Sequence, residues 1–280
     1  MKYTIAVYTL FLMLVVACKD EPALEESIFD TNPPELSELD IWLRSNYTIP
    51  YNIEVLYLWD DNEVEQGSFL FPPEESRVKP LMKAIKLVWI DPYTQLGGDD
   101  FIKKTAPRQI VLVGSYNVNS NGSVTLGTAD SGLKITLFRI NYLDLKDIKL
   151  VKRLLKTVQH EYCHILNQTK PFSPKFQTIT PSKYDGSWTN YSLKEALEDG
   201  FITQYARSSP SDDFAELTST ILTNSKEDYE AIISGISGED AKKAIRAKES
   251  IISEYFSSAW NIDLYQLQAL SHKKLEELTQ

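Results

Sequence analysis

The stretch QHEYCH, residues 159–164, gives the strongest indication of the chemistry to expect. The chain has three histidines in 280 residues, and two of them stand four positions apart with a glutamate directly after the first. On a helix, residues four apart differ by about 40° in direction and lie about one turn apart. Two such imidazoles can share one metal ion at about 2.0–2.1 Å. The spacing therefore predicts a metal site with His160 and His164 as ligands.

The residues around this motif predict a long amphipathic helix. No glycine or proline occurs between Leu133 and Pro171, and Asp144 or Asp147 can cap a helix start. Asn167 and Pro171 are typical of its end. The apolar residues recur at helical spacing: Ile148, Val151, Leu154, Leu155, Val158, Tyr162 and Ile165. The two histidines are therefore expected near the C-terminal end of the helix.

Glu161 stands between the two histidines. On a helix its side chain is turned by about 100° from that of His160, so it is poorly placed as a third ligand. It is well placed to take a proton from a water molecule at the metal, which is the chemistry of the H-E-x-x-H motif. The alternative is two exposed histidines beside an ordinary glutamate. We favour the metal site, because a chain with so few histidines rarely gives this pattern by chance.

A catalytic zinc site uses three protein ligands and keeps one position open, so a third ligand must come from elsewhere. Cys163 points about 100° away from His164 and is expected to pack in the core. His272 is the remaining histidine, and its neighbours Lys273 and Lys274 indicate a solvated position. An acid is expected instead, and the candidates lie downstream: Glu195, Glu198, Asp199, Asp212, Asp213 and Glu216.

The segments before the motif helix predict a small sheet. Residues 52–59 (NIEVLYLW), 109–115 (QIVLVGS) and 132–140 (GLKITLFRI) are rich in branched and aromatic residues, which is typical of strands. Asn121-Gly122 indicates a hairpin. Strands in the first half and helices from Ser192 onward predict an α+β fold.

Two further helices are indicated in the first half of the chain. Residues 36–45 form a short amphipathic pattern. Apolar residues from Val78 to Val88 also have helical spacing, but Pro80 is expected to interrupt that helix. Gly97-Gly98 breaks the chain after it, and residues 172–191 are loop-like.

The N-terminus is typical of a secretory signal, because Lys2 is followed by an uncharged, mainly apolar run over residues 3–17. This run is shorter than the about 20 residues that a membrane-spanning helix needs. Its end, LVVAC at residues 14–18, resembles a bacterial lipoprotein signal. The resemblance implies that residues 1–17 are removed and that Cys18 carries lipid. An ordinary signal peptide with a chance cysteine is the alternative.

Lys19-Asp20-Glu21, directly after Cys18, resembles the surface-export signal of Bacteroidetes-type lipoproteins. It implies a lipoprotein of the outer membrane, anchored by its lipid and exposed on the cell surface. Residues 18–35 are polar and acidic and predict a tether, which leaves residues 36–280 for the domain. With Cys18 lipidated, Cys163 has no intramolecular partner, so the domain has no disulfide.

Composition limits the partners of this domain. Hydrophobic residues make up 42% of the chain and aromatic residues 11%, which is enough for a core. The net charge of -10 argues against nucleic acid or an anionic membrane surface as a partner.

Residues 200–217 (GFITQYARSSPSDDFAEL) follow QHEYCH after about forty residues. Together the two segments resemble the zinc metallopeptidase-like lipoproteins encoded beside starch-utilisation-type import systems. The resemblance extends over most of the mature chain, including residues 52–59, 111–115 and 125–138. It implies a zincin-like α+β fold, with a small mixed sheet followed by a mostly helical C-terminal half. It also implies a Zn2+ cofactor, a peptide or protein substrate and an outer-membrane importer as partner.

The second segment is also similar to the zinc-site helix of anthrax lethal factor and the Pro-Pro endopeptidases. In those proteins a tyrosine precedes a glutamate ligand by seven residues, and that glutamate begins a run ending in Phe-Ala-Glu. On this resemblance the tyrosine falls on Tyr205, the third ligand on Asp212 and the closing glutamate on Glu216. Aspartate stands here where glutamate is usual, so its helix must approach zinc more closely. The residues alone leave an alternative, since Asp212 in Ser209-Pro210-Ser211-Asp212 could simply complement a helix dipole.

Two more residues have competing interpretations. Glu216 shares a helix face with Asp212, so it could hold a ligand histidine or be the third ligand itself. Tyr205 could donate to a developing oxyanion, or it could be a buried aromatic that follows Phe201 at helical spacing.

The favoured interpretation is a zinc-dependent hydrolase that acts as a peptidase. His160, His164 and Asp212 hold the ion, Glu161 is the base and Tyr205 steadies the oxyanion. By analogy with zincin-like folds, the strand over residues 134–140 is expected beside the cleft, where it would pair with an extended substrate. One alternative is a non-catalytic accessory lipoprotein that captures peptide or glycan for an importer. Another is a hydrolase of non-peptide amides or esters.

Overall fold

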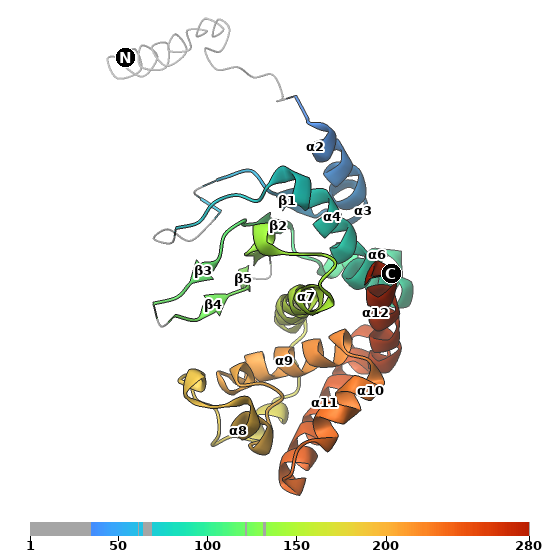
Figure 1. Cartoon of the computed structure of the whole chain (residues 1–280). Helices are drawn as coiled ribbons and strands as arrows, with labels where there is room; N and C mark the ends of the chain where they lie inside the picture. Colours follow the sequence, from blue (N-terminus) through green and yellow to red (C-terminus); the bar gives the residue numbers. More distant parts are fainter. Residues whose placement is uncertain (1–34, 61, 64–68, 121, 131–132, 280) are drawn as a thin grey trace, which may run out of the picture. The chain divides into compact units, whose positions relative to one another are not determined.

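The computed structural model describes residues 35–60, 62–63, 69–120, 122–130 and 133–279 (Figure 1). The predicted signal peptide over residues 1–17, Cys18 and the tether up to residue 34 lie outside the described residues. Contacts group Glu38–Gln280 into one unit, which holds all the helices and strands given below. Among the described residues, no helix is long and apolar enough to cross a membrane.

A four-stranded mixed sheet forms the upper part of the unit in Figure 1. Its strands, in spatial order, are β1 (Glu54–Leu56), β2 (Gln109–Leu112), β6 (Lys134–Leu137) and β5 (Gly127–Asp130). β1, β2 and β6 run parallel, with Ile110 opposite Val55 and Ile135, whereas β5 is antiparallel to β6. The predicted strands are confirmed, although each is shorter than the sequence pattern.

The position of β6 corrects one expectation. The strand predicted beside the cleft, within residues 134–140, is paired with β2 on one side and β5 on the other. Its backbone groups are therefore not free to bind an extended peptide. The strand at this end of the sheet is β5.

A separate hairpin extends from the sheet. β3 (Asn117–Val118) and β4 (Val124–Thr125) are antiparallel, and the amide of Gly122 donates to the Asn119 carbonyl across 2.9 Å. The hairpin expected at Asn121-Gly122 is confirmed by this pairing, while Asn121 itself lies outside the described residues.

Helical segments precede β1 and connect β1 with β2. They are α2 (Glu38–Leu43), η1 (Arg44–Thr48), α3 (Ile49–Tyr51), α4 (Glu75–Ile85), η2 (Lys86–Ile90), α5 (Asp91–Gly97) and α6 (Asp99–Thr105). Pro80 lies inside α4, so the expected interruption is wrong. The buried face of α4, with Val78, Leu81 and Ile85, compensates for the hydrogen bond that proline removes. Gly98, with a φ of 86°, separates α5 from α6.

The motif helix α7 (Ile148–Thr169) crosses the middle of the unit, where Figure 1 shows it nearly end-on between the sheet and α9. Asp147 caps its start by accepting from the amides of Lys149 and Leu150. The predicted apolar stripe is buried, and Tyr162 packs edge-on against Trp89 and Tyr93. Burial of this stripe fixes the rotation of α7 about its axis. The face with the two histidines is thereby turned toward α9.

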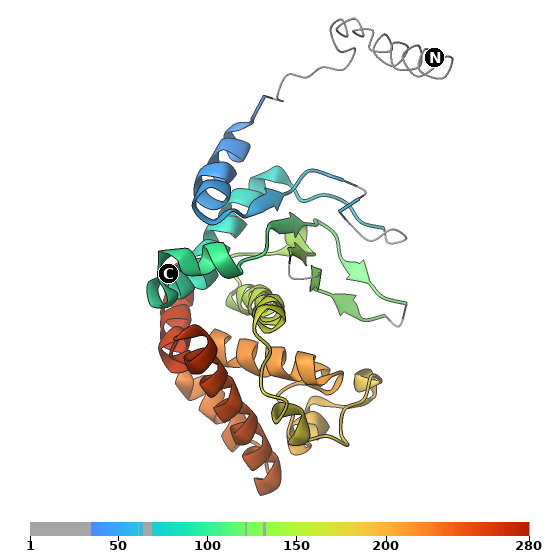
Figure 2. The ribbon, with the colours of Figure 1, turned by 180° about the vertical axis from the view of Figure 1, so that it is seen from behind.

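The second half is helical, as predicted. Its helices are α8 (Leu193–Glu198), α9 (Pro210–Thr223), α10 (Lys226–Ser234), α11 (Glu239–Trp260) and α12 (Leu264–Thr279). The connections contain single turns: η3 (Ile140–Tyr142), η4 (Phe176–Thr178), η5 (Trp188–Asn190) and η6 (Tyr205–Arg207). Figures 1 and 2 show α11 and α12 on the side of the unit opposite the β3–β4 hairpin. The α+β fold with a small mixed sheet and a mostly helical C-terminal half is confirmed.

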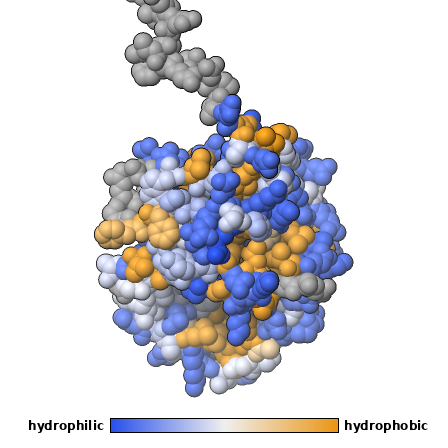
Figure 3. Space-filling view, turned by 45° about the horizontal axis from the view of Figure 1, so that its top comes forward, coloured by the Kyte–Doolittle hydropathy of each residue, from blue (hydrophilic) through white to orange (hydrophobic). Residues whose placement is uncertain are grey.

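A buried ion pair holds α9 in place. Lys248 Nζ on α11 lies 2.6 Å from Asp213 Oδ2, and both side chains are 1% exposed or less. The Lys248 ammonium also donates to the Gly200 carbonyl, and Tyr184 donates to Asp213. Because Asp213 is held toward α11, its neighbour Asp212 is turned toward α7. The outer surface is mainly hydrophilic on the face shown in Figure 3, with separate hydrophobic patches.

Candidate metal centre

Three side chains from two helices converge between α7 and α9. One ligand atom each from His160, His164 and Asp212 lies within 4.8 Å of the others. The two Nε2 atoms are 3.0 Å apart, and Asp212 Oδ1 lies 3.4 Å from His164 Nε2 and 3.8 Å from His160 Nε2. Tetrahedral zinc with bonds of about 2.0–2.1 Å places its ligand atoms about 3.4 Å apart. The three distances scatter around that value, so the donor set fits a zinc ion.

The convergence of these atoms requires a positive charge between them. Two imidazole lone pairs and a carboxylate oxygen facing one another repel unless a proton or a cation lies between them. The neighbouring carboxylates also affect the pKa of His160. Burial lowers it, but hydrogen bonds to Asp212 and Glu216 outweigh burial and raise it to about 9. The raised pKa means that the metal-free protein favours the protonated form of His160 at neutral pH.

Glu216 fixes the orientation of the His160 ring through Nδ1, the ring nitrogen that does not face His164. Its Oε1 lies 2.9 Å from His160 Nδ1. Although burial raises its pKa, Lys156 and His160 bring the pKa of Glu216 well below the usual value. The ionised carboxylate can only accept, so Nδ1–H donates to it and the Nε2 lone pair is left for a metal. Of the two roles open to Glu216, the structure places it where it holds the histidine.

Two residues that sequence analysis missed support Glu216. Lys156 Nζ and Thr203 Oγ1 each lie 2.6 Å from Glu216 Oε2. Lys156 stands four residues before His160 on α7, so helical spacing could have indicated a cation on the same face. Thr203 lies in the loop before α9, and no sequence pattern marks it.

Asp212 reaches the histidines from the first turn of α9. Its Oδ2 accepts hydrogen bonds from Ser208 Oγ at 2.6 Å and Ser209 Oγ at 2.7 Å, which leaves Oδ1 toward the imidazoles. Burial raises the pKa of Asp212, but His160, His164 and the two serines hold it well below the usual value. The predicted helix start is confirmed, since Ser209 accepts from the Asp212 amide and Pro210 begins α9. Asp212 therefore lies both in a first helical turn and in the metal-ligand group.

His164 is positioned by Ser211, whose Oγ lies 3.1 Å from His164 Nδ1. This hydroxyl can accept from Nδ1–H, which again leaves Nε2 toward the group. Each histidine thus has a partner that fixes its ring, a carboxylate for His160 and a hydroxyl for His164.

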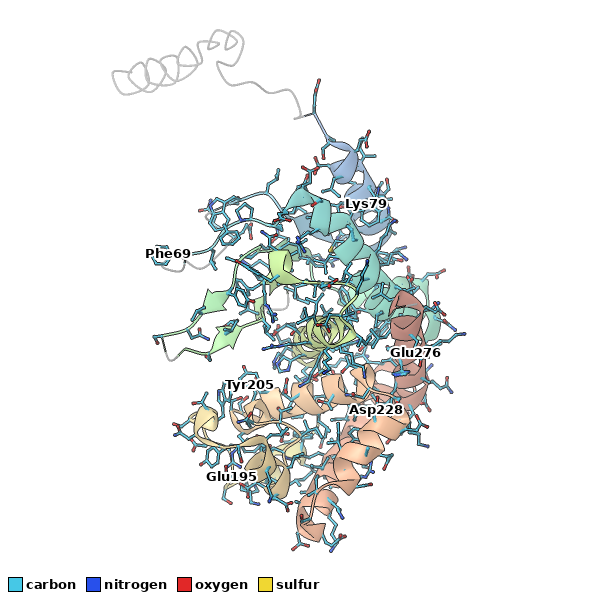
Figure 4. All side chains as sticks on the ribbon, viewed as in Figure 1. Phe69, Lys79, Glu195, Tyr205, Asp228 and Glu276 are labelled. Atoms are coloured by element: carbon cyan, nitrogen blue, oxygen red, sulfur yellow. The ribbon has the colours of Figure 1, made fainter. Side chains whose placement is uncertain are left out.

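Glu161 and Tyr205 face a cleft beside the three ligands. The cleft, about 530 Å³ in volume, is lined by the strands around β4 and β5, by α7, and by Trp188 and Tyr205. Figure 4 shows Tyr205 between α7 and the helices below it. Burial raises the pKa of Glu161, while the two ligand histidines act in the opposite direction. A carboxylate with a raised pKa is a better proton acceptor near neutral pH.

Tyr205 has the position of a hydrogen-bond donor at the cleft. Its ring centroid lies 5.8 Å from that of His160, and 39% of the residue is exposed. Burial, followed by the charges of Asp212 and Glu161, raises the pKa of Tyr205 well above its usual value. The phenol therefore keeps its proton and can donate it in a hydrogen bond. The alternative of a fully buried packing role does not fit this exposure.

A second hollow lies on the His164 side of the group. It measures about 340 Å³ and is bounded by α7, by the segment from Pro171 to Gln177, and by Ser211. His160, His164 and Asp212 therefore lie between two open spaces, one beside His160 and Glu161 and the other beside His164.

The other candidate acids have structural partners away from this group. Glu195 caps α8 with Ser192, Glu198 accepts from the amides of Ser237 and Gly238, Asp199 pairs with Lys183 and Arg207, and Asp213 pairs with Lys248. His272 lies on α12, with Nδ1 3.8 Å from Glu276 Oε1. Cys163 is buried, and burial raises the pKa of its thiol to about 12, so it packs as expected.

The α+β fold, with a His-His-Asp group and an adjacent glutamate, is consistent with a zinc-binding metallopeptidase-like protein. Residues 32–265 match the family described as "Putative zinc-binding metallo-peptidase", and the chain belongs to this family. Zinc is thus the cofactor to which the three ligands correspond.

A solved structure is also similar. The crystal structure of a "putative zinc-binding metallo-peptidase" from Bacteroides caccae is 31% identical in sequence, with a TM-score of 0.72. The match covers 90% of this chain and 97% of that one. Comparison with curated proteins gives no significant match.

Proposed function

We propose that the protein is a zinc-dependent peptidase, with His160, His164 and Asp212 as the metal ligands. The observation that carries the proposal is the position of Glu161. This buried carboxylate follows the first ligand, faces the open cleft, and has a pKa raised by burial. A purely structural zinc site needs no such base at an open cleft.

The residues of the chain have distinct roles in hydrolysis. Zinc, when bound, acts as a Lewis acid that favours deprotonation of water and polarises a carbonyl. Glu161 accepts the proton of the attacking water and passes it to the leaving amine. The Tyr205 hydroxyl donates a hydrogen bond to the carbonyl oxygen as negative charge develops there. Glu216 and Ser211 keep the two imidazoles in the tautomer that presents Nε2.

The free side of β5 provides a place for an extended peptide backbone. β5 is the last strand of the sheet, and Gly127 at its start lines the cleft. A Cβ at Gly127 would lie 2.5 Å from Thr157 Cγ2 on α7, so glycine permits this close approach of strand and helix. A peptide that adds to β5 would pass directly over the motif helix.

The sequence supports a location for this activity. We propose that Cys18 carries lipid after removal of residues 1–17 and that the protein is an outer-membrane lipoprotein exposed on the cell surface. Association with a starch-utilisation-type importer rests on the same sequence resemblance. Metabolic labelling with a radioactive fatty acid tests the anchor, because Cys18→Ala should abolish incorporation.

The test of the function compares wild type with Glu161→Gln after removal of the N-terminal 35 residues and loading with zinc. Both proteins are expected to bind one zinc ion, and only wild type should cleave peptides in a mixed library. We expect the substitution to lower cleavage at least a hundredfold, because the general base is lost. Bound zinc without any cleavage that depends on Glu161 would contradict the peptidase and favour an accessory protein that captures ligands.

A further inference from the structure

The cleft beside Glu161 carries a positive charge that no zinc-site role explains. Its charged lining residues are Arg153, Lys156, Glu161 and Glu216, besides the ligand His160. Lys156 is neutralised by Glu216, since their charged atoms lie 2.6 Å apart. Arg153 is exposed, and within the described part of the chain no carboxylate lies within ion-pair distance of its guanidinium. Arg153 is therefore an uncompensated cation at the wall of the cleft.

The position of Arg153 relates it to the reaction centre. It stands seven residues before His160 on α7, so the two side chains share a face about two turns apart. This separation is about 10 Å along the helix axis. An extended peptide advances about 3.4 Å per residue, so Arg153 lies opposite a substrate residue about three positions from the scissile bond.

The hollow on the other side of the metal ligands differs in charge. Besides His164, its lining consists of uncharged residues: Asn167, Gln168, Pro171, Phe172, Pro174, Gln177 and Ser211. The cleft therefore has a cation without an ion-pair partner at Arg153, whereas the lining of the hollow contains no lysine or arginine. Such an asymmetry gives a bound peptide a preferred direction and register.

The rest of the molecule does not supply this preference. With a net charge of -10, the chain exerts no general attraction on acidic peptides. A preference for an anion at a distance from the metal site requires a local cation, and Arg153 is a lining cation for which the described residues provide no ion-pair partner. A guanidinium keeps its charge at all physiological pH values and can bind a carboxylate through two parallel hydrogen bonds.

We propose that Arg153 is a specificity-determining residue that binds a carboxylate of the peptide substrate on one side of the scissile bond. This inference rests on the proposed peptidase function. The carboxylate is supplied by an aspartate or glutamate side chain, or by the C-terminus of a short peptide. The first source gives an endopeptidase selective for acidic positions, and the second gives an enzyme that trims peptide ends.

The test uses a neutral peptide that the zinc-loaded protein cleaves. Glutamate is placed singly at each position around the cleaved bond, with glutamine at the same position as the matched control. Each peptide is made with a free and with an amidated C-terminus, which separates the two sources of carboxylate. We expect kcat/KM to rise about tenfold for glutamate over glutamine on one side of the bond, or for the free over the amidated end.

Variants at the cleft assign the effect to Arg153. Arg153→Gln should bring the ratio of kcat/KM between the carboxylate peptide and its neutral control close to one. Arg153→Glu should instead favour a peptide with lysine at the same position. Lys152→Gln is the matched control, because Lys152 is turned toward Asp228 on α10 and does not line the cleft. It removes one positive charge from the same helix and should keep the wild-type ratio. An unchanged ratio in Arg153→Gln overturns the inference.

A binding measurement keeps this test separate from the proposed chemistry. Short peptides of alanine, serine and glycine with one central glutamate or glutamine are titrated into zinc-loaded Glu161→Gln. We expect about tenfold tighter binding of the glutamate peptide, and no difference once Arg153→Gln is added. If cleavage does not depend on Glu161 but binding depends on Arg153, the peptidase proposal fails and the carboxylate site stands. If wild-type binding shows no preference for carboxylate, the inference fails whether or not peptides are cleaved.

Discussion

At the scale of single residues, the candidate metal site depends on side chains outside the His160, His164 and Asp212 group. Asp212 has one carboxylate oxygen held by two serines and the other directed at the imidazoles. Glu216 has one oxygen on His160 and the other on Lys156 and Thr203. Each carboxylate thus has one oxygen that fixes its position and one that acts on the site. Serines before and at the start of α9 hold the short side chain of Asp212 in place, with its other oxygen toward the histidines.

Replacement of Glu216 by glutamine tests the support of His160. The amide is nearly the same shape, but it is a weaker acceptor from Nδ1–H and leaves Lys156 without its counter-charge. Loss of such a partner typically lowers metal affinity about 10- to 100-fold. Competition with a fluorescent chelator measures this affinity. Glu198→Gln serves as the control, because Glu198 accepts hydrogen bonds from the amides of Ser237 and Gly238 and not from His160. Equal zinc affinity in Glu216→Gln and wild type would refute the assigned role.

Protons and zinc are expected to compete for His160. The pKa of this imidazole in the metal-free protein is raised from 6.5 to about 9. Its contribution to folding stability is therefore fully present below about pH 6.5 and is lost as the pH rises through about 9. Zinc must displace that proton, so zinc affinity should increase up to the same pH.

Thermal unfolding at several pH values checks this competition. Between pH 6.5 and 9 the melting temperature of metal-free protein should fall, while the gain on adding zinc should increase. His160→Gln removes the titrating group and should flatten the first trend. A metal-free melting temperature that rises over this range in wild type would contradict the prediction.

Helical spacing explains which site residues the sequence alone could predict. His160, Glu161 and His164 lie on one helix, where the direction of each side chain follows from its position in the turn. Asp212 is one of six downstream acids, and only the resemblance to a known zinc-site helix distinguishes it from the others. Spacing gives directions within a helix, but it does not say which two helices pack together, and that contact decides the third ligand.

At the scale of elements, the position of α9 matters as much for the candidate metal site as that of the motif helix α7. Neighbouring acids at its start point in different directions, Asp213 to the buried Lys248 and Asp212 to the histidines. The sequence pattern predicts neither the exact strand ends nor β5 as a strand, because both depend on pairing between segments. α4 continues through Pro80 for a similar reason, since burial of its apolar face outweighs one missing hydrogen bond.

Removal of the lysine from this buried pair should weaken both the fold and the site. Lys248→Met leaves the Asp213 carboxylate buried without its cation, which typically costs about 3–5 kcal/mol. Chemical denaturation should show this loss in metal-free protein, and zinc affinity should fall because α9 is less well held. The double variant Lys248→Met/Asp213→Leu is the control, since replacement of both charges should restore most of the stability. A loss below about 1 kcal/mol in the single variant would show that the pair does not anchor α9.

At the scale of the whole molecule, the candidate metal site lies where two helices, α7 and α9, pack directly on each other, and each of them also packs on a different part of the unit. The histidines belong to α7, which packs on the sheet, and Asp212 belongs to α9, which packs on α11 and α12. A bound ion would link these two layers at the mouth of the cleft. Zinc should therefore act as a cross-link between the two halves of the fold as well as a cofactor.

Removal of zinc is expected to lower the melting temperature of the whole unit. A ligand at about a thousand times its dissociation constant stabilises the folded state by about 4 kcal/mol. For a domain of this size, each kcal/mol shifts the melting temperature by about 2–4 °C, so EDTA should lower it by about 8–16 °C. Glu161→Gln should show the same shift, because this residue is not a ligand, whereas Asp212→Ala should show almost none. If Asp212→Ala responds to EDTA as wild type does, the cross-link does not run through α9, and the third ligand must be sought on another element.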